Sequence, residues 1–205
     1  MAGRPRGVDD AVILRAAVEV IGRVGPAKLT LAAVADEVGL VPGTLVQRFG
    51  SKRGLLLALA EQAARDAETL HERVRAGQGD QRDGQAGREP ALATLRAFVR
   101  RSWSAMSTPE QYANHLAFLC MDLTDPEFHA HALAVHEANG RVIAMLLGEA
   151  VADGVLREET DAEALAASLQ TVIAGAGLCW ALDRRGTLAE RLERELDGAL
   201  APHLA

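Results

Sequence analysis

The 205-residue chain is long enough for one domain of good size, or for a small domain joined to a larger one. Hydrophobic residues make up 49% and charged residues 24% of it, which is a globular composition and excludes a disordered chain. The formal charge of −6 is uneven: residues 1–54 carry eight basic and five acidic side chains, or +3, and residues 55–205 carry −9. A basic end on an acidic body indicates that only the first part meets a polyanion.

The chain shows no secretory signal, and we find no apolar run that approaches the roughly 20 residues needed to span a bilayer. Cys120 and Cys179 fit no disulfide framework, CxxC pair or zinc spacing. We therefore expect a cytoplasmic protein with two buried, reduced thiols and no membrane partner.

Helical periodicity runs through almost every segment, and no convincing alternating strand pattern is present. We expect an all-α protein of about nine helices, near residues 8–24, 30–38, 41–49, 51–75, 90–107, 109–123, 126–152, 160–183 and 187–201. Helix starts are marked by capping boxes at 108–111, 160–163 and 187–190, and by Asp125-Pro126. Residues 75–90 are polar and glycine-rich, which is typical of a flexible surface connection.

The first fifty residues predict a helix-turn-helix. Two apolar stripes, at positions 13, 14, 17, 20 and 21 and at 31, 34, 35 and 38, define two short helices. Gly39 permits the left-handed turn that follows, and Leu45 and Phe49 fasten the next helix to the core. That helix then presents its polar side chains to solvent, as a DNA-reading helix must.

Residues 11–60 resemble the N-terminal DNA-binding region of the TetR family of bacterial transcriptional regulators. The resemblance covers about a quarter of the chain and rests on the joint spacing of its shared residues. These are Ala17, Ile21, Gly25, Thr30, Val34, Ala35, Gly39, Gly43, Thr44, Leu45, Phe49, Ser51, Lys52, Leu55 and Leu56.

The resemblance implies which residues contact double-stranded DNA. Thr30, Thr44 and Lys52 would bind phosphates, and Arg48 would add another contact to a DNA phosphate. Pro42, Gly43, Val46 and Gln47 would face base edges in the major groove. Arg4 and Arg6 resemble basic arms that lie against DNA in some members.

Three positions depart from the family pattern and leave the target sequence open. Val41 stands where a capping serine is usual, and it cannot cap a helix. Val46 replaces a frequent tyrosine and offers only apolar contact. Arg53 follows Lys52 where glutamate is common, which adds a cation next to the DNA-facing surface.

The acidic body carries most of the large soft side chains. The resemblance implies a small-molecule pocket here, and an apolar or aromatic ligand held by Tyr112 or His115 is compatible with the sequence; ordinary core packing is the alternative for each residue. The candidate ligand-binding residues are Phe98, Trp103, Met106, Tyr112, His115, Phe118 and Phe128.

Three histidines, His129, His131 and His136, do not form a metal site by spacing. Helical ligand pairs stand three or four residues apart, whereas these lie two, five and seven apart. We expect them to face solvent, and we expect no metal and no cofactor.

The last two helices are candidates for a dimer interface, as in the family, with intrachain core as the alternative. Small residues in 164–182 allow close helix approach, and leucines spaced by four make 188–200 amphipathic. The candidate interface residues are Leu165, Leu169, Val172, Ile173, Ala176, Leu188, Leu192 and Leu196.

These features predict a helix-turn-helix domain at 1–54, helix 51–75 as connector, and a ligand-binding and dimerisation domain at 55–205. The hypothesis is a homodimeric TetR-type repressor that leaves a palindromic operator when a small, largely apolar effector binds. A helical interaction module without DNA binding, and less readily a helical enzyme, are the alternatives. We find no P-loop, nucleophile elbow, HExxH or paired carboxylates, and so expect no enzyme.

Overall fold

The computed structural model describes residues 8–79 and 90–205, and within these ranges every regular element is a helix. Four helices open the chain: α1 (Asp10–Lys28), α2 (Leu31–Glu37), α3 (Pro42–Phe49) and α4 (Lys52–Gly79). Five more form the body: α5 (Pro90–Ser102), α6 (Pro109–Asp122), α7 (Pro126–Ala152), α8 (Ala162–Asp183) and α9 (Leu188–Leu200). A short 3₁₀ turn, Ala201–His203, and a β-bridge between Leu156 and Leu204 hold the C-terminal end. The expected all-α class is confirmed.

Helix boundaries differ from the sequence expectation at three places. α1 continues to Lys28 through a kink at Gly25, and α4 continues to Gly79 rather than ending at 75. α5 ends at Ser102 instead of 107, where the hydroxyls of Ser102 and Ser104 bond to carbonyls of the last helical turn. The expected loop at 75–90 is helical up to Gly79, and most of the rest lies outside the described residues.

The predicted N-caps are present with one shift. Thr108 and Thr187 each form a full capping box, and the Asp125 side chain accepts from Glu127 N–H. At α8 the cap is Asp161, which accepts from Ala164 N–H, and not Thr160 as the capping box at 160–163 implied.

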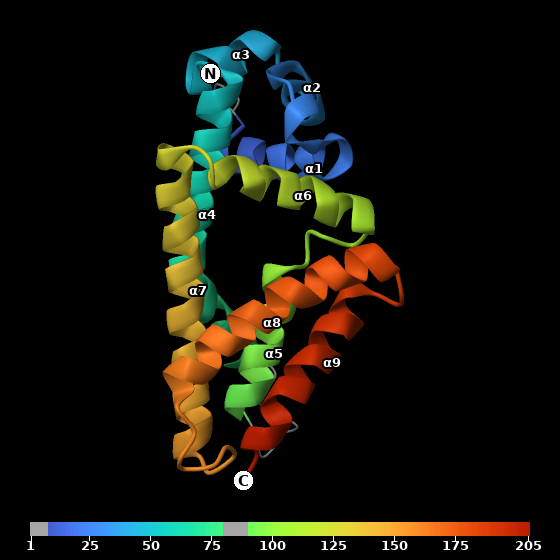
Figure 1. Cartoon of the computed structure of the whole chain (residues 1–205). Coiled ribbons are helices and arrows are strands. Elements are labelled where there is room, and N and C mark those ends of the chain that lie inside the picture. The colour runs from blue at the N-terminus through green and yellow to red at the C-terminus, as the bar shows by residue number, and fades with distance from the viewer. Residues whose placement is uncertain (1–7, 80–89) are drawn as a thin grey trace.

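The helices form two parts joined along α4 (Figure 1). α1, α2 and α3 gather around the first turns of α4, while α5, α8 and α9 lie at the opposite end. α7 runs beside α4 along its length, and α6 crosses directly beneath α1. α6 is therefore the layer on which the first helices rest.

Two hydrophobic cores follow this division. The N-terminal core unites α1, α2, α3 and the first turns of α4, and it also takes in Phe128 from α7. The larger core unites α5 to α9 around Leu95, Leu147 and Leu169. Since Phe128 is 5% exposed and packs in the N-terminal core, the body is anchored in that core by a side chain.

Two sequence expectations are wrong: that no apolar run approaches the length of a membrane span, and that both cysteines are buried. By length and composition alone, α8 could cross a membrane, and it is the one such helix in the described ranges. One face of it nevertheless lies in the body core through Leu165, Leu169 and Ile173. Cys120 and Cys179 are both exposed rather than buried, because each stands on the outer face of its helix.

The contact between α1 and α6 depends on small residues in α1. The amide of Asn114 donates to the carbonyl of Gly22 at 2.8 Å, so the two helices approach closely. Gly25 has φ 79° and ψ 162°, a conformation open essentially to glycine alone. A Cβ there would also lie 2.9 Å from the Asn114 side-chain oxygen.

We expect Gly25→Ala to lower the free energy of unfolding by about 1–3 kcal/mol, because it combines backbone strain with crowding against α6. Gly148→Ala is the matched control: it lies inside α7 with no atom near the added Cβ, and should be neutral or stabilising by up to about 1 kcal/mol. Urea denaturation of both variants measures the difference. Equal stability of the two variants would contradict the assigned role of Gly25.

Candidate nucleic-acid interface and ligand pocket

The turn between α2 and α3 is built on Gly39. Its φ of 68° is left-handed, and the next residue, Leu40, donates its N–H to the carbonyl of Ala35 at 2.9 Å, closing the end of α2. The Thr30 hydroxyl accepts from Ala33 N–H at 3.1 Å and fixes the start of the same helix. Both ends of α2 are thereby set, and they fix the direction in which α3 leaves.

α3 divides its residues between core and solvent as the sequence predicts. Leu45 is fully buried and Phe49 is partly buried against the N-terminal core. The outward residues of the helix are Pro42, Gly43, Val46 and Gln47, all exposed, with Thr44 half-buried beside them. Val41 stands at the N-cap of α3 without a side-chain bond. The N-cap side chain therefore accepts no hydrogen bond from the backbone N–H groups of the first turn.

Two of the expected phosphate-binding cations are held in place by the protein itself. Arg48 Nη1 donates to the Val8 carbonyl at 2.5 Å and to Asp10 at 2.9 Å, which ties α3 to the start of α1. Lys52 Nζ donates to the Ala27 carbonyl at 2.8 Å. Arg4 and Arg6 lie outside the described residues, so their role remains a prediction.

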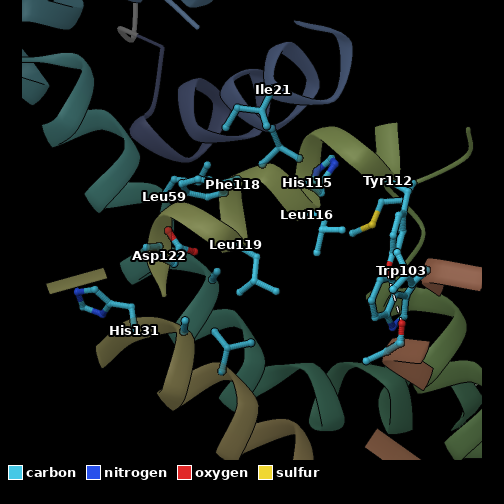
Figure 2. Close-up of a pocket in the computed structure, with 18 of the residues that line it drawn as sticks. Ile21, Leu59, Trp103, Tyr112, His115, Leu116, Phe118, Leu119, Asp122 and His131 are labelled. Carbon is cyan, nitrogen blue, oxygen red and sulfur yellow. Dashed lines mark hydrogen bonds between the residues drawn. The ribbon is translucent and has the colours of Figure 1, made fainter. Parts of the chain in front are cut away.

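A pocket of about 720 Å³ lies where the N-terminal helices meet the body (Figure 2). Its walls come from α1 and α4 of the N-terminal part and from α6, α7 and α8 of the body, with the α5–α6 connection at one end. The lining is almost wholly apolar. Ile21 and Leu59 line it together with Leu119, so a molecule in the pocket would contact the N-terminal core and the body at once.

Five of the seven candidate ligand residues line this pocket: Trp103, Met106, Tyr112, His115 and Phe118. Trp103 and Tyr112 stack with ring centroids 5.8 Å apart, which closes one end of the cavity. The other two do not line it. Phe98 is 2% exposed inside the body core, and Phe128 belongs to the N-terminal core, where burial of an aromatic ring outweighs exposure to a cavity.

Several pocket residues were not expected from the sequence. Val18, Ile21 and Leu59 fit the apolar stripe of a helix core, and nothing in that pattern marks a side chain that is left facing a cavity. His131 corrects the expectation of solvent-facing histidines, because it is half-buried on the pocket wall, whereas His129 and His136 are exposed. Among the described residues no group of metal-binding side chains occurs.

Two polar side chains of the pocket wall, Asp122 and His115, lie on α6 and have a buried atom without a partner among the described residues. Asp122 is 8% exposed, and its Oδ1 has no hydrogen-bond partner among the described residues. Burial raises the pKa of this carboxyl to about 6, and the nearby charge of Asp125 adds to the shift. His115 bonds through Nδ1 to the Gln111 carbonyl at 2.8 Å, while its buried Nε2 has no partner among the described residues.

The corner between α6 and α7 is fastened to the start of α4 by Arg53. Its guanidinium donates to Asp125 and Glu127, each at 2.7 Å, and lies 5.1 Å from the centre of the Phe128 ring. The hydrogen bond from Arg53 holds the pKa of Asp125 below its ordinary value. Arg53, absent from the candidate DNA contacts, thus links its neighbour Lys52, a candidate DNA contact, to the corner that follows Asp122.

The structure corrects the candidate dimer residues. Seven of the eight are at most 7% exposed within their own chain, and Val172 is partly exposed. They pack α8 and α9 against each other and against α7, so the alternative of intrachain core applies to Leu165, Leu169, Ile173, Ala176, Leu188, Leu192 and Leu196. The exposed face of α8 carries other residues, including Ala174, Gly175, Leu178 and Leu182.

Comparison with known proteins agrees with this geometry. Residues 13–59 match the family model of bacterial regulatory proteins of the tetR family. Over 68 residues, 33% of this chain, it is 37% identical to the HTH-type transcriptional regulator BetI of Stenotrophomonas maltophilia (strain R551-3), and the match spans 35% of that regulator.

Solved structures extend the likeness to the whole fold. SmeT, the repressor of the S. maltophilia multidrug efflux pump SmeDEF, superposes with a TM-score of 0.64 at 23% identity, over 97% of this chain and 92% of that one. Thermus thermophilus FadR, a repressor solved with lauroyl-CoA, superposes with a TM-score of 0.54 at 26% identity, over 96% of both chains.

A helix-turn-helix with an exposed third helix, set on a helical body that holds a pocket, is the arrangement of a transcriptional regulator. The pattern in residues 13–59 is that of the DNA-binding region of the TetR family of bacterial regulatory proteins. The whole chain shares its fold with SmeT and with FadR, which is a TetR-family repressor.

We expect Arg53→Gln to loosen the α6–α7 corner, because it removes both bonds that join the corner to α4. Amide hydrogen exchange in residues 122–130 should rise at least threefold, with little change in the rest of α7. Arg65→Gln is the control, because it removes the same charge without touching the corner. Arg65 pairs with Glu61 inside α4. Equal exchange in the two variants would show that Arg53 does not hold the corner.

Proposed function

We propose that the chain is a ligand-responsive repressor that binds a palindromic operator as a homodimer and is released by a small molecule in the pocket. Residues 1–54 would read DNA, and residues 55–205 would bind the ligand and the second subunit, with α4 as the connector. The observation that carries the proposal is that one pocket is lined both by α1 and α4 and by α6, α7 and α8. The repressor that we propose would act in the cytoplasm.

The DNA-binding surface would be the exposed side of α3 together with its flanks. Gln47 and the Val46 methyl groups would meet base edges, since both side chains point outward and Val46 is 50% exposed. Thr30, Thr44, Arg48 and Lys52 would contact phosphates on either side. Arg48 and Lys52 already have fixed positions through their bonds to Asp10 and Ala27, so little side-chain entropy would be lost on binding.

Ligand release requires that the effector bind one arrangement of the two parts better than the other, because only differential affinity shifts the equilibrium. The pocket would meet this condition through Ile21 of α1 and Leu59 of α4, which line it and would move relative to α6 when the N-terminal helices move. Arg53 would transmit the shift to the start of α4.

The homodimer would form through the exposed face of α8. Leu182 is exposed on this helix outside the pocket lining, whereas the exposed Thr171, Ala174, Gly175 and Leu178 also line the pocket, so a second subunit here would border the pocket as well. The small Ala174 and Gly175 would permit a close approach of a second helix. Leu182 is 76% exposed and Leu178, one helical turn earlier, is 46% exposed, so the two form an apolar patch that a partner would cover. A two-fold pair would set two α3 helices about 34–36 Å apart, to meet successive major-groove faces.

Two sets of substitutions separate phosphate contacts from base reading. Arg48→Ala with Lys52→Ala should weaken binding to operator and to random-sequence duplex alike, and reduce the slope of log affinity against log salt by about 2. Gln47→Ala should instead cost about 1–3 kcal/mol on the operator and leave random duplex almost unaffected. Fluorescence anisotropy, with an operator obtained by sequence selection, measures both. Absence of binding at low salt would favour a helical interaction module.

We expect Leu182→Glu to shift the protein from dimer towards monomer, because it places a charge in the proposed apolar contact. Leu123→Glu is the control, since Leu123 is 59% exposed at the α6–α7 corner and lies outside that face. Light scattering coupled to size-exclusion chromatography reads the mass over a dilution series. Identical behaviour of the two variants would exclude this face of α8 as the interface.

A further inference from the structure

Asp122 is an acid that lies on an apolar wall and has no partner among the described residues. Its side chain is 8% exposed, and Oδ1 has no hydrogen bond among the described residues. The cation of this corner, Arg53, is bonded to Asp125 and Glu127 instead. The last turn of α6 thus carries a carboxylate into the pocket, where Figure 2 shows it beside Leu59 and Phe118.

A buried carboxylate without a partner is costly to the folded protein. Buried charges in proteins are normally paired or hydrogen-bonded, because desolvation is otherwise uncompensated. The raised pKa of Asp122, about 6, is a sign of that cost. At pH 7 and above the group is nevertheless largely ionised, so the pocket holds a negative charge that a ligand can neutralise.

His115 gives a second, independent indication of the same chemistry. A carbonyl can only accept, so the 2.8 Å contact with the Gln111 carbonyl places the proton on Nδ1. In the neutral ring, the buried Nε2 is then an acceptor, and it has no partner among the described residues. The two buried pocket atoms without a partner among the described residues, Asp122 Oδ1 and His115 Nε2 of the neutral ring, therefore both call for a donor.

The pocket offers an apolar stretch between this acid and its aromatic end. Asp122 and the stacked pair of Trp103 and Tyr112 lie toward opposite ends of the cavity (Figure 2). Tyr112 and Asp122 are ten residues apart on α6, about 15 Å along the helix axis. A ten-carbon chain can lie within this span.

We propose that the effector is an organic cation with an apolar body, whose protonated amine binds Asp122 and whose apolar end lies against Trp103 and Tyr112. The proposal rests on the proposed function in taking this pocket as the effector site. An anionic acyl ligand would bring a second negative charge to Asp122 and is disfavoured. A neutral ligand would fill the apolar walls but leave the acid unpaired.

Three probes of one chain length test the proposal: decylamine, decanol and decanoate, each below its micelle concentration. Calorimetric titration of the full chain at pH 7.5 should show decylamine binding at least tenfold more tightly than decanol, with decanoate weakest. Equal affinities, or tightest binding of decanoate, would overturn the proposal. This comparison needs no variant, so it decides the point even if a substitution fails to fold.

Asp122→Asn should reduce decylamine affinity at least tenfold and change decanol affinity less than threefold. The control is Asp153→Asn, an exposed acid at the end of α7 that should leave both affinities unchanged. Without ligand, Asp122→Asn should raise the melting temperature at pH 7.5, because the folded-state pKa exceeds the unfolded value and the cost of ionisation is present above about pH 6. Wild-type decylamine affinity in Asp122→Asn would overturn the assignment.

The pH dependence gives a further readout. The titratable side chains that line the pocket are Tyr112, His115, Asp122 and His131, with Asp125 close to Asp122. Decylamine affinity should fall as the pH is lowered from 7 to 5, in the wild type and in His115→Gln and His131→Gln, while Asp122→Asn shows no such fall. A flat wild-type profile, or one abolished only by a histidine variant, would contradict the pairing with Asp122.

These measurements are made without DNA, so they fail separately from the proposed function. If decylamine binds through Asp122 but does not release the operator, the pocket chemistry stands and release by ligand fails. If a neutral or anionic molecule releases the operator instead, the repressor stands and the cationic effector fails.

Discussion

The close packing of α6 beneath α1 is the contact on which the rest of the structure depends. One side of α6 meets α1, where Asn114 bonds to Gly22 and Gly25 leaves room for it. Another side presents His115, Leu119 and Asp122 to the pocket. The same helix thus supports α1 of the helix-turn-helix domain and forms a wall of the cavity, so a molecule in the cavity would contact that support.

The corner after α6 adds a second connection of a different kind. Phe128 is buried in the N-terminal core, where it contributes through apolar burial, and Arg53 binds Asp125 and Glu127 at the start of α7. Arg53 is about half exposed, so solvent screens its ion pairs and their effect is on position more than on stability. Burial anchors the corner, and the directional bonds of Arg53 fix the angle between α4 and the body.

The pocket combines an apolar lining with an uncompensated charge. A cavity lined with leucine, valine and aromatic side chains binds by burial and accepts many shapes, whereas Asp122 adds one requirement, a positive partner. Because the charge is desolvated, it contributes more to discrimination between ligands than an exposed acid would. Selectivity in this site would accordingly rest on the charge of the ligand and much less on its shape.

The sequence by itself determined the helices, most of their caps and the division of α3 into buried and exposed residues. These depend on local periodicity and on side chains that bond within one turn, as at Thr30, Thr108 and Thr187. The tertiary structure alone decided which face of each helix is covered. A stripe such as Leu165, Leu169 and Ile173 is equally suited to a second subunit or to its own chain, and only packing assigns it to the latter. Packing likewise left Ile21 and Leu59 beside a cavity, because a void depends on how helices far apart in the chain meet, and no spacing within one helix records that.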